Sequence, residues 1–512
     1  MNRHEGEPAV AVRYGDWSPD RPGWLFGLSG RTVAAVLLAG LPALVATGLH
    51  RWNVVLGWLP VWGLLTAALC VPVAGRPAGR WALDAALYAL GAAAGWSAWQ
   101  SRAASGRAGD PTQADLPGVL AGIRTHDGPP LGPALSRPAI VQDRAARSWA
   151  AVARISHPGI ALVEATGRAR MAAGLSELLE GAACAELVSV LALQVRTVPD
   201  DGAQRAAWQA RHVRTDAPPV ALAVEAELGQ ALVQAGVRHE AFVTVVVDEG
   251  RIRRQARQGG GGLDGTARAL YAVIGEVEAR LLGATGCTTV SWLDSSELAA
   301  VIRTGFAPGD AAALTPQPQH PGGGPRAGGL PLAAAGPTLA PSPGRRHYVH
   351  DAWSSATCTV LLPEQGALMG ALAPILTPSA AEERRCVSVF FEPLARQRAD
   401  RLVGREAMSA GTAAELRTRM GFQTRAAHRR DSNRVHDADS RLAAGRSLVR
   451  VAVAAAVTVP SHWGVAEHAE RLEASVRAAG FTPLRLDLAQ DSAFAAACVP
   501  LGIGLPRRRD SR

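Results

Sequence analysis

The chain has 512 residues, of which 48% are apolar, so it can bury more than one hydrophobic core and is neither disordered nor fibrous. Its formal charge is +9, yet all 53 basic residues are arginine and no lysine is present. The missing lysine excludes a phosphate-binding loop of the usual kind and Schiff-base chemistry. Because a GC-rich genome favours arginine codons, the positive charge alone does not point to nucleic acid as a partner.

Two uncharged apolar runs lie near the N-terminus, at residues 33–48 and 53–74. With its flanks, each approaches the roughly 20 residues that cross about 30 Å of hydrocarbon as a helix. The connection is short, so we predict a transmembrane helical hairpin over residues 31–75, preceded by a cytoplasmic tail at 1–30. A cleaved signal peptide is disfavoured because a second full run follows at once, and a buried globular hairpin would show polar faces.

Arginines set the predicted orientation of this hairpin. Positive charge collects on the cytoplasmic side of membrane segments, so both ends should be cytoplasmic. The predicted location is therefore the inner (plasma) membrane, with two spans and the bulk of the chain in the cytoplasm. Tryptophans near the second run suit the lipid headgroups. The arginines are Arg13, Arg21 and Arg31 before the hairpin, Arg51 in the connection, and Arg76 and Arg80 after it; the tryptophans are Trp52, Trp58 and Trp62.

The next segment, residues 76–135, is predicted to be a juxtamembrane region. Its Ala-rich stretch from Trp81 to Trp99 carries Asp84 in its first turn and is less apolar than the two preceding runs. An interfacial helix along the cytoplasmic leaflet fits this stretch better than a third span. A linker follows, from about residue 101.

Beyond the linker, strands and helices alternate, which predicts a membrane-anchored α/β (or α+β) protein with two cytoplasmic domains. The first domain covers residues 136–304. Asp294 and Glu297 form a capping box that opens a helix at Ser295, which is a structural signal without catalytic meaning. The predicted strands are 139–142, 149–155, 187–198, 241–247 and 288–292, and the predicted helices are 168–182, 201–211, 218–236, 266–284 and 295–303.

A Pro- and Gly-rich linker at residues 305–346 leads to the second domain, at residues 347–508. This domain should contain two arginine-rich helices, 394–408 and 412–444, and end in a β-α-β unit. No internal repeat is evident in the sequence. The predicted strands are 357–362, 386–392, 448–458 and 484–488, and the last predicted helix is 461–479.

Several residue groups have compositions found in catalytic or metal sites, but none has the required context. His239 and Glu240 lack the second histidine of a zinc-protease motif, so packing is the better interpretation. His347, His350 and Asp351 have a metal-ligand spacing but no matching distant cluster. The sequence therefore assigns these residues to a polar strand entry after the linker.

The remaining groups lead to the same conclusion. His436, Asp437 and Asp439 lie among arginines in what should be a solvated helix. The arginines of 251–257, followed by Gly259–Gly262, indicate an exposed helix ending at a hinge, although they could present cations and amides to a phosphate. Six scattered cysteines, Cys70, Cys184, Cys287, Cys358, Cys386 and Cys498, indicate small buried residues in a reducing compartment. We therefore expect no catalytic, cofactor-binding or metal-binding residues and no cofactor. Because only 5% of residues are aromatic, dedicated nucleic-acid recognition is not expected either.

Three segments carry a family resemblance: WLDSSELAAVIRTGFAPGD at 292–310, DAWSSATCTVLLPEQ at 351–365 and RRCVSVFFEPLARQRADRLVGREAMS at 384–409. They resemble membrane proteins of actinobacterial integrative conjugative elements. In those proteins a PrgI-like two-helix membrane module precedes a region similar to the N-terminal, non-motor part of the type IV secretion (conjugation) ATPase. The resemblance implies a scaffold without catalytic residues, which would require a separate ATPase to supply hydrolysis.

The expected function is therefore an integral membrane component of a conjugative or type IV secretion-like complex. Its expected partners are membrane lipid, a separate secretion ATPase and other membrane subunits, in an oligomeric assembly. Two alternatives remain open. One is a component of the type VII secretion membrane complex, which can also carry two N-terminal spans. The other, from a different class, is a membrane-tethered enzyme.

Overall fold

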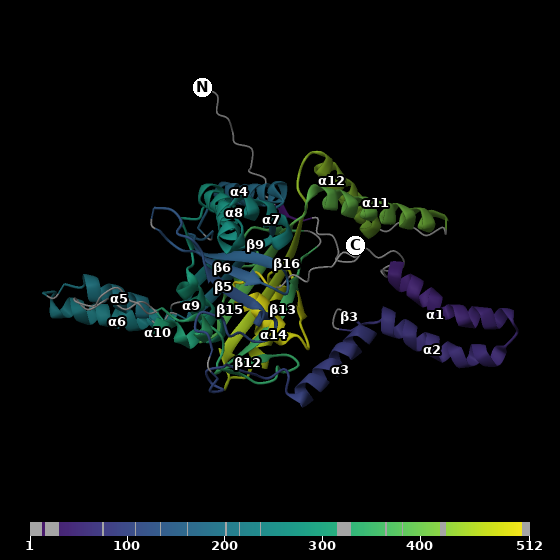
Figure 1. The fold of residues 1–512 in the computed structure, drawn as a ribbon, viewed down its shortest axis with the longest axis horizontal. Coiled ribbons are helices and arrows are strands. Elements are labelled where there is room, and N and C mark those ends of the chain that lie inside the picture. The colour runs from purple at the N-terminus through teal and green to yellow at the C-terminus, as the bar shows by residue number, and fades with distance from the viewer. Residues whose placement is uncertain are drawn as a thin grey trace, which may run out of the picture.

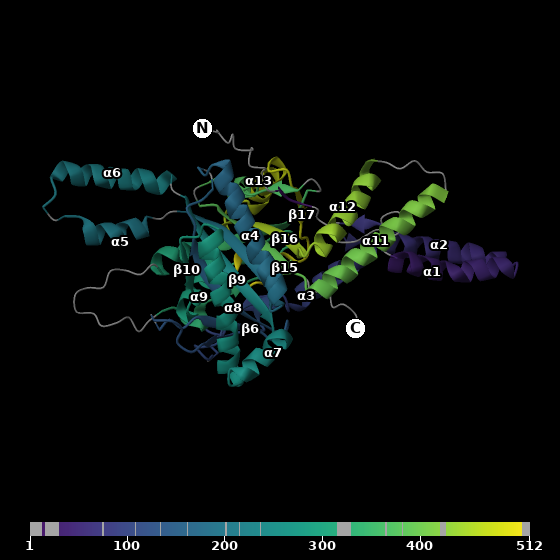
Figure 2. The same ribbon diagram turned by 90° about the horizontal axis from the view of Figure 1, so that it is seen from above.

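A computed structural model describes residues 13–15, 30–73 and 76–503, except 108, 134, 161, 200–201, 215, 236, 315–328, 364–365, 381 and 420–425. The chain forms a mixed α/β body from which three helical pairs project (Figures 1 and 2). The predicted mixed α/β class is confirmed. Most of the N-terminal tail and the middle of the Pro- and Gly-rich linker lie outside the described residues.

One antiparallel sheet organises the body. It has eleven strands in the order β12-β13-β16-β15-β8-β9-β7-β6-β5, with β10 also pairing with β7 and β17 also pairing with β13. The ranges predicted as two domains, 136–304 and 347–508, each contribute strands, and the β8–β15 pairing joins them in one sheet. The strands are β5 (Ile123–Asp127), β6 (Ala139–Asp143), β7 (Ser148–Ser156), β8 (Val188–Pro199), β9 (Val237–Asp248), β10 (Thr289–Trp292), β12 (Tyr348–His350), β13 (Trp353–Leu361), β15 (Arg384–Pro393), β16 (Val449–Pro460) and β17 (Thr482–Arg485).

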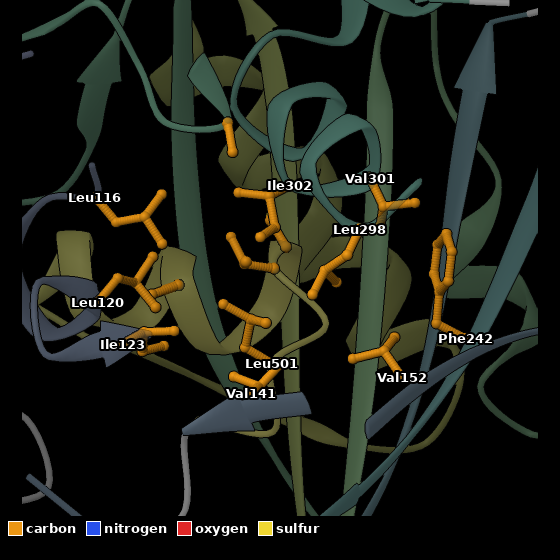
Figure 3. Packing of buried hydrophobic residues seen from close by; sticks show 14 of the residues in the cluster. Leu116, Leu120, Ile123, Val141, Val152, Phe242, Leu298, Val301, Ile302 and Leu501 are labelled. Atoms are coloured by element: carbon orange, nitrogen blue, oxygen red, sulfur yellow. The ribbon is translucent and has the colours of Figure 1, made fainter. Parts of the chain in front are cut away.

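Helices cover both faces of the sheet, so the central strands alternate between two apolar cores. On β15, Cys386 and Phe390 point into the core beneath α9 (Ser295–Phe306) and α14 (Gln490–Cys498), whereas Val387 and Phe391 point to the opposite face. That opposite face is covered by α4 (Ala165–Ala185), α8 (Gly262–Ala284) and α13 (Val465–Ala478). Figure 3 shows the first core, where Leu298, Val301 and Ile302 of α9 face Val141 and Val152 of the sheet.

The two halves of the sheet repeat one topology. In the first half, β7 is bordered outside by β6 and β10 and inside by β9, and β9 pairs with β8. In the second half, β13 is bordered outside by β12 and β17 and inside by β16, and β16 pairs with β15. The two innermost strands, β8 and β15, pair antiparallel, which relates the halves by an approximate twofold axis.

The connections repeat as well as the strands. A projecting helical pair follows each innermost strand: α5 (Ala203–His212) with α6 (Pro219–Ala235) after β8, and α11 (Arg396–Arg419) with α12 (Ala426–Ala443) after β15. A covering helix then leads to the short outer strand, α8 before β10 and α13 before β17, and a last helix follows, α9 or α14. The halves differ chiefly between their first two long strands, where α4 is replaced by the short helix η4 (Ala373–Leu376).

Several segments differ from the sequence expectations. Residues 101–135, expected to be a linker, contain β5 and bury Leu116 and Leu120 in the core. Both described ends of the 305–346 segment are structured: α10 (Ala311–Leu314) follows α9, and Leu332 is buried. The break between the arginine-rich helices follows Arg419 rather than Met408. Gly411, which lies between the two predicted helices, is inside α11.

Candidate membrane-anchoring site

The helices α1 (Gly30–Gly48) and α2 (Trp52–Cys70) pack side by side as a hairpin (Figure 1). A short turn joins them, with His50 at a φ of 55° and the Arg51 N–H donating to the Ala46 carbonyl at 2.9 Å. Ala46 is 5% exposed, so its small side chain lets the helices approach closely near the turn. The two helices therefore form one element, which is the hairpin geometry expected from the short connection.

Two indole groups connect the helices. Trp58 Nε1–H donates to the Ala39 carbonyl at 2.8 Å, and Trp62 Nε1–H donates to the Val36 carbonyl at 3.0 Å. Trp62 also packs on Gly40, where an added Cβ would lie 3.1 Å from Nε1. Both indoles therefore bind the partner helix within the hairpin, and the expectation that Trp58 and Trp62 lie at the headgroups stays a prediction.

The outer surface of the hairpin is apolar and uncovered. Leu44, Leu56 and Leu64 are 74%, 71% and 73% exposed. Among the described residues, one helix, Trp52–Cys70, is long and apolar enough to cross a membrane, with a mean hydropathy of 1.6 and no buried share. The apolar part of α1 described at its side chains, Thr32–Gly48, is shorter. Exposed leucines at this density are costly in water, since burying one contributes about 1.5–3 kcal/mol.

Both ends of the hairpin return to the body. Before α1, β1 (Arg13–Tyr14) pairs with β14 (Ala367–Leu368), and the Tyr14 hydroxyl donates to the Ala172 carbonyl of α4 at 2.8 Å. After α2, a two-strand turn of β2 (Pro72–Val73) and β3 (Arg76–Pro77) leads directly into α3 (Ala78–Ala94). Described residues before the hairpin therefore contact the body, and the chain after the hairpin continues directly into α3.

The helix α3 is attached to the body along one face. The Tyr88 hydroxyl donates to the Pro343 carbonyl at 2.6 Å, and the Arg345 guanidinium lies over the Trp81 ring at 5.4 Å. Just after α3, β4 (Trp99–Gln100) pairs with β11 (Leu339–Ala340). The other face of α3 is apolar and exposed, with a helical stripe formed by Leu83, Leu87 and Leu90.

The histidines that had metal-ligand spacing have structural partners. His350 is fully buried against Phe306 and Phe494, and its Nε2 is hydrogen-bonded to Ser355 Oγ at 2.8 Å. Burial, with help from the charge of Arg384, lowers the pKa of His350 to about 3, so its ring is neutral. Asp351 instead accepts hydrogen bonds from Arg303 at 3.0 Å and from the Thr338 and Leu339 amides. His347 is half-buried near Gly344.

The His239–Glu240 pair also has a structural role. Glu240 bonds Arg196 at 2.7 Å and Arg238 at 3.2 Å. Burial opposes the charge on Glu240, but the two guanidinium groups outweigh it and lower the pKa of the carboxyl to about 2. The carboxylate is therefore permanently ionised and held in an ion pair rather than poised to move a proton.

Two buried arginines were not singled out in the sequence. Arg196 of β8 donates to the Val301 carbonyl at 3.0 Å and to Thr304 Oγ1 at 2.7 Å, while Arg384 of β15 donates to the Thr304 and Gly305 carbonyls. Thr304 and Gly305 lie in the last turn of α9, where carbonyls lack helical partners and the helix dipole is negative, and Val301 lies in the turn before it. The sequence feature that could have predicted these contacts is an arginine at a core-facing position of an otherwise apolar strand, since such a charge needs buried acceptors.

The other candidate groups lie apart from one another. His436, Asp437 and Asp439 are exposed on α12. The helix α7 (Glu249–Gln258) carries the arginine run, and Gly260, Gly261 and Gly262 have φ values of 107°, 71° and 62° in the turn to α8. The cysteines Cys287, Cys358, Cys386 and Cys498 are buried as expected, Cys70 is half-buried, and Cys184 is exposed, contrary to expectation.

A hollow of about 600 Å³ lies between α13 and β17. Its charges pair with each other: Glu473 with Arg477 at 3.0 Å and with Arg485 at 2.5 Å, and Arg346 with Asp487 at 3.4 Å. Within the described residues, no group of three or more His, Cys, Asp or Glu side chains is placed to hold a metal ion. The uncovered apolar hairpin is therefore the feature with the clearest physical demand for a partner.

No protein-family model and no curated protein sequence matches this chain.

Proposed function

We propose that this chain is a membrane-anchored structural component of a conjugative or type IV secretion-like complex, in which α1 and α2 both span the inner membrane. The observation that supports this most directly is the uncovered apolar hairpin whose two ends return to one body. Each helix has 19 residues, which rise about 28 Å and nearly match the hydrocarbon thickness. A hairpin with both ends on one side requires an even number of crossings.

The proposed orientation places the body in the cytoplasm. Arginines flank the base of the hairpin, whereas the turn carries Arg51 alone. The β1–β14 pairing supports the placement of both ends of the hairpin on the same side of the membrane, because it ties Arg13–Tyr14 to the body that follows α2. The exposed Leu83, Leu87 and Leu90 stripe of α3 would then lie along the cytoplasmic leaflet.

The proposed role of the body is to dock a separate ATPase. The chain has no lysine for a phosphate-binding loop, and its buried charges pair with one another or with helix ends. A sheet of eleven strands with two projecting helical arms offers a large surface for other subunits. The resemblance of segments 292–310, 351–365 and 384–409 to the non-motor region of conjugation ATPases supports this assignment.

Reporter fusions test the topology. Alkaline phosphatase, which is active only outside the cytoplasm, is expected to be active when fused after Arg51 and inactive when fused after Arg80; a fluorescent protein that folds only in the cytoplasm should give the opposite pattern. Activity of the phosphatase after Arg80 would overturn the two-span proposal.

Crosslinking and pull-down from native membranes test the partners. A lysine-bearing conjugation ATPase should be recovered with the wild-type chain and lost when the body is removed after Arg80. Recovery of type VII secretion subunits instead would place the chain in that system. The scaffold proposal would fail if the purified chain hydrolysed ATP, or bound stoichiometric metal that alanine at His347 and His350 abolished.

A further inference from the structure

The two helical arms occupy equivalent positions in the repeated topology but differ in charge. The α11–α12 arm, residues 396–443, contains eleven arginines and six acidic residues, a net charge of +5. The α5–α6 arm, residues 203–235, contains three of each, a net charge of zero. One arm therefore carries more than half of the charge of +9 of the whole chain. The two arms occupy equivalent positions in the repeated topology, so the topology itself does not explain why only one of them is strongly basic.

The arms also point in opposite directions. In both Figure 1 and Figure 2, α11 and α12 project to the same side of the body as the α1–α2 hairpin, whereas α5 and α6 project to the other side. The charged arm is therefore the one on the side of the proposed membrane. Anionic lipid attracts arginines that lie within about a Debye length of the leaflet surface.

The base of the α11–α12 arm is fixed, and its outer face is basic. Ala399 and Val403 of α11 pack with Leu442 of α12 in a small core of their own. On the opposite face of α11, Arg401, Arg405 and Met408 follow one another at spacings of four and three residues and are all exposed. Met408 is 73% exposed, which leaves an apolar side chain beside two guanidinium groups. This combination suits the boundary between lipid headgroups and acyl chains.

We propose that the α11–α12 arm is a second, electrostatic membrane contact, which binds the anionic cytoplasmic leaflet through the face of Arg401, Arg405 and Met408. The proposal rests on the proposed function, because it needs α1–α2 to be inserted in that membrane. Nucleic acid is the competing polyanion. The position of the arm beside the hairpin favours lipid, and the paucity of exposed aromatics on the described part of the arm disfavours base stacking.

The test uses the full chain in lipid nanodiscs, with Cys184→Ser to remove the exposed native thiol. A fluorophore is placed at Met408→Cys, and quenching by a headgroup nitroxide lipid is measured in discs of phosphatidylcholine alone and of phosphatidylcholine with phosphatidylglycerol. We expect quenching only in the anionic discs, with loss in high salt and in the Arg401→Gln/Arg405→Gln variant, since glutamine preserves helix propensity. The matched control is Val220→Cys on α6, which is 74% exposed and should stay unquenched in both discs.

A further label separates failure of this inference from failure of the proposed function. Leu64→Cys on α2 is 73% exposed and should be quenched by an acyl-chain nitroxide if the hairpin is inserted. An unquenched Leu64 label would overturn the membrane anchor itself. With Leu64 quenched, an unquenched Met408 label, or equal quenching at Val220, would overturn the arm contact alone. Binding of duplex DNA that depends on Arg401 and Arg405, with no lipid-dependent quenching, would assign the arm to nucleic acid.

Discussion

Two buried arginines in this protein donate hydrogen bonds to carbonyls near the C-terminal end of α9. Arg384 is fully buried, and two of its nitrogens serve the last carbonyls of α9, while Arg196 serves the preceding turn and pairs with Glu240. The sequence showed these arginines in apolar strands but could not show their acceptors, because α9 lies more than 75 residues from either strand. Buried ionic contacts of this kind depend on the tertiary arrangement and have no local sequence pattern.

Removing Arg384 should destabilise the body strongly. Arg384→Leu leaves the Thr304 and Gly305 carbonyls buried without donors, and we expect a loss of about 3 kcal/mol or more. Thermal unfolding of the detergent-purified chain should show a lower midpoint. Arg401→Leu, which changes an exposed arginine, is the control and should leave the midpoint nearly unchanged. An equal effect of both substitutions would contradict the role given to Arg384.

Acid should weaken the fold through His350. Its pKa is about 3 in the folded protein and 6.5 when unperturbed, so the unfolded chain binds the extra proton first as the pH falls. The stability contributed by the neutral ring is complete above pH 6.5 and is lost progressively towards pH 3, at up to about 1.4 kcal/mol per pH unit. The fall of the unfolding midpoint between pH 6.5 and 4.5 should be shallower in His350→Gln, which cannot titrate. Identical slopes would exclude His350 as the cause.

At the scale of elements, regular patterns in the sequence predicted the bounds of many strands and helices. The strands β6, β7, β8 and β10 and the helices α4, α5 and α6 lie within three residues of their expected bounds, because apolar periodicity and flanking Gly or Pro residues are local signals. The capping box of α9 is also present as expected, with both reciprocal hydrogen bonds formed. The sequence analysis did not predict β5 or α14, which are short and are held in place by strand pairing or by packing in the core.

The capping box of α9 can be tested directly. Asp294 Oδ1 accepts the Glu297 amide at 2.8 Å, and Glu297 Oε2 accepts the Asp294 amide at 3.1 Å. Asp294→Ala should cost about 1 kcal/mol and speed amide hydrogen exchange in the first turn of α9. Asp294→Asn, which retains a side-chain acceptor, should restore most of the protection. Unchanged exchange in the alanine variant would show that tertiary packing alone fixes this helix end.

At the scale of the whole molecule, the repeated topology is the feature that sequence reasoning missed. No repeat is evident in the sequence, although the two halves share their strand order and most of their connections. Binary patterns specify that a strand has two apolar faces, but not which strand it pairs with. The prediction of membrane spans, by contrast, used only the length and apolarity of two local runs, and among the described residues one helix, Trp52–Cys70, is long and apolar enough to cross a membrane.

The shared sheet should hold the halves together after the chain is cut. A protease site inserted between residues 315 and 328, followed by cleavage, should yield two pieces that co-elute in detergent, because β8–β15 pairing and the core under α9 and α14 join them. Val389→Pro places a proline in the middle of β15, opposite Leu193 of β8, and should promote separation of the cleaved pieces. Separation without denaturant in the otherwise unchanged chain would show that the covalent link is essential.

The attachment of α3 has a mechanical consequence for any assembly that contains this protein. Since the Tyr88–Pro343 hydrogen bond and the β4–β11 pair join the segment that follows the α1–α2 hairpin to the body, the body cannot rotate freely about a flexible tether. A force applied to the hairpin would act first on the hydrogen bonds between β4 and β11, before the sheet could change its orientation. If the hairpin is inserted as proposed, the body would therefore hold a fixed tilt relative to the bilayer, and force applied to the body would be transmitted to the membrane rather than absorbed by an extending linker.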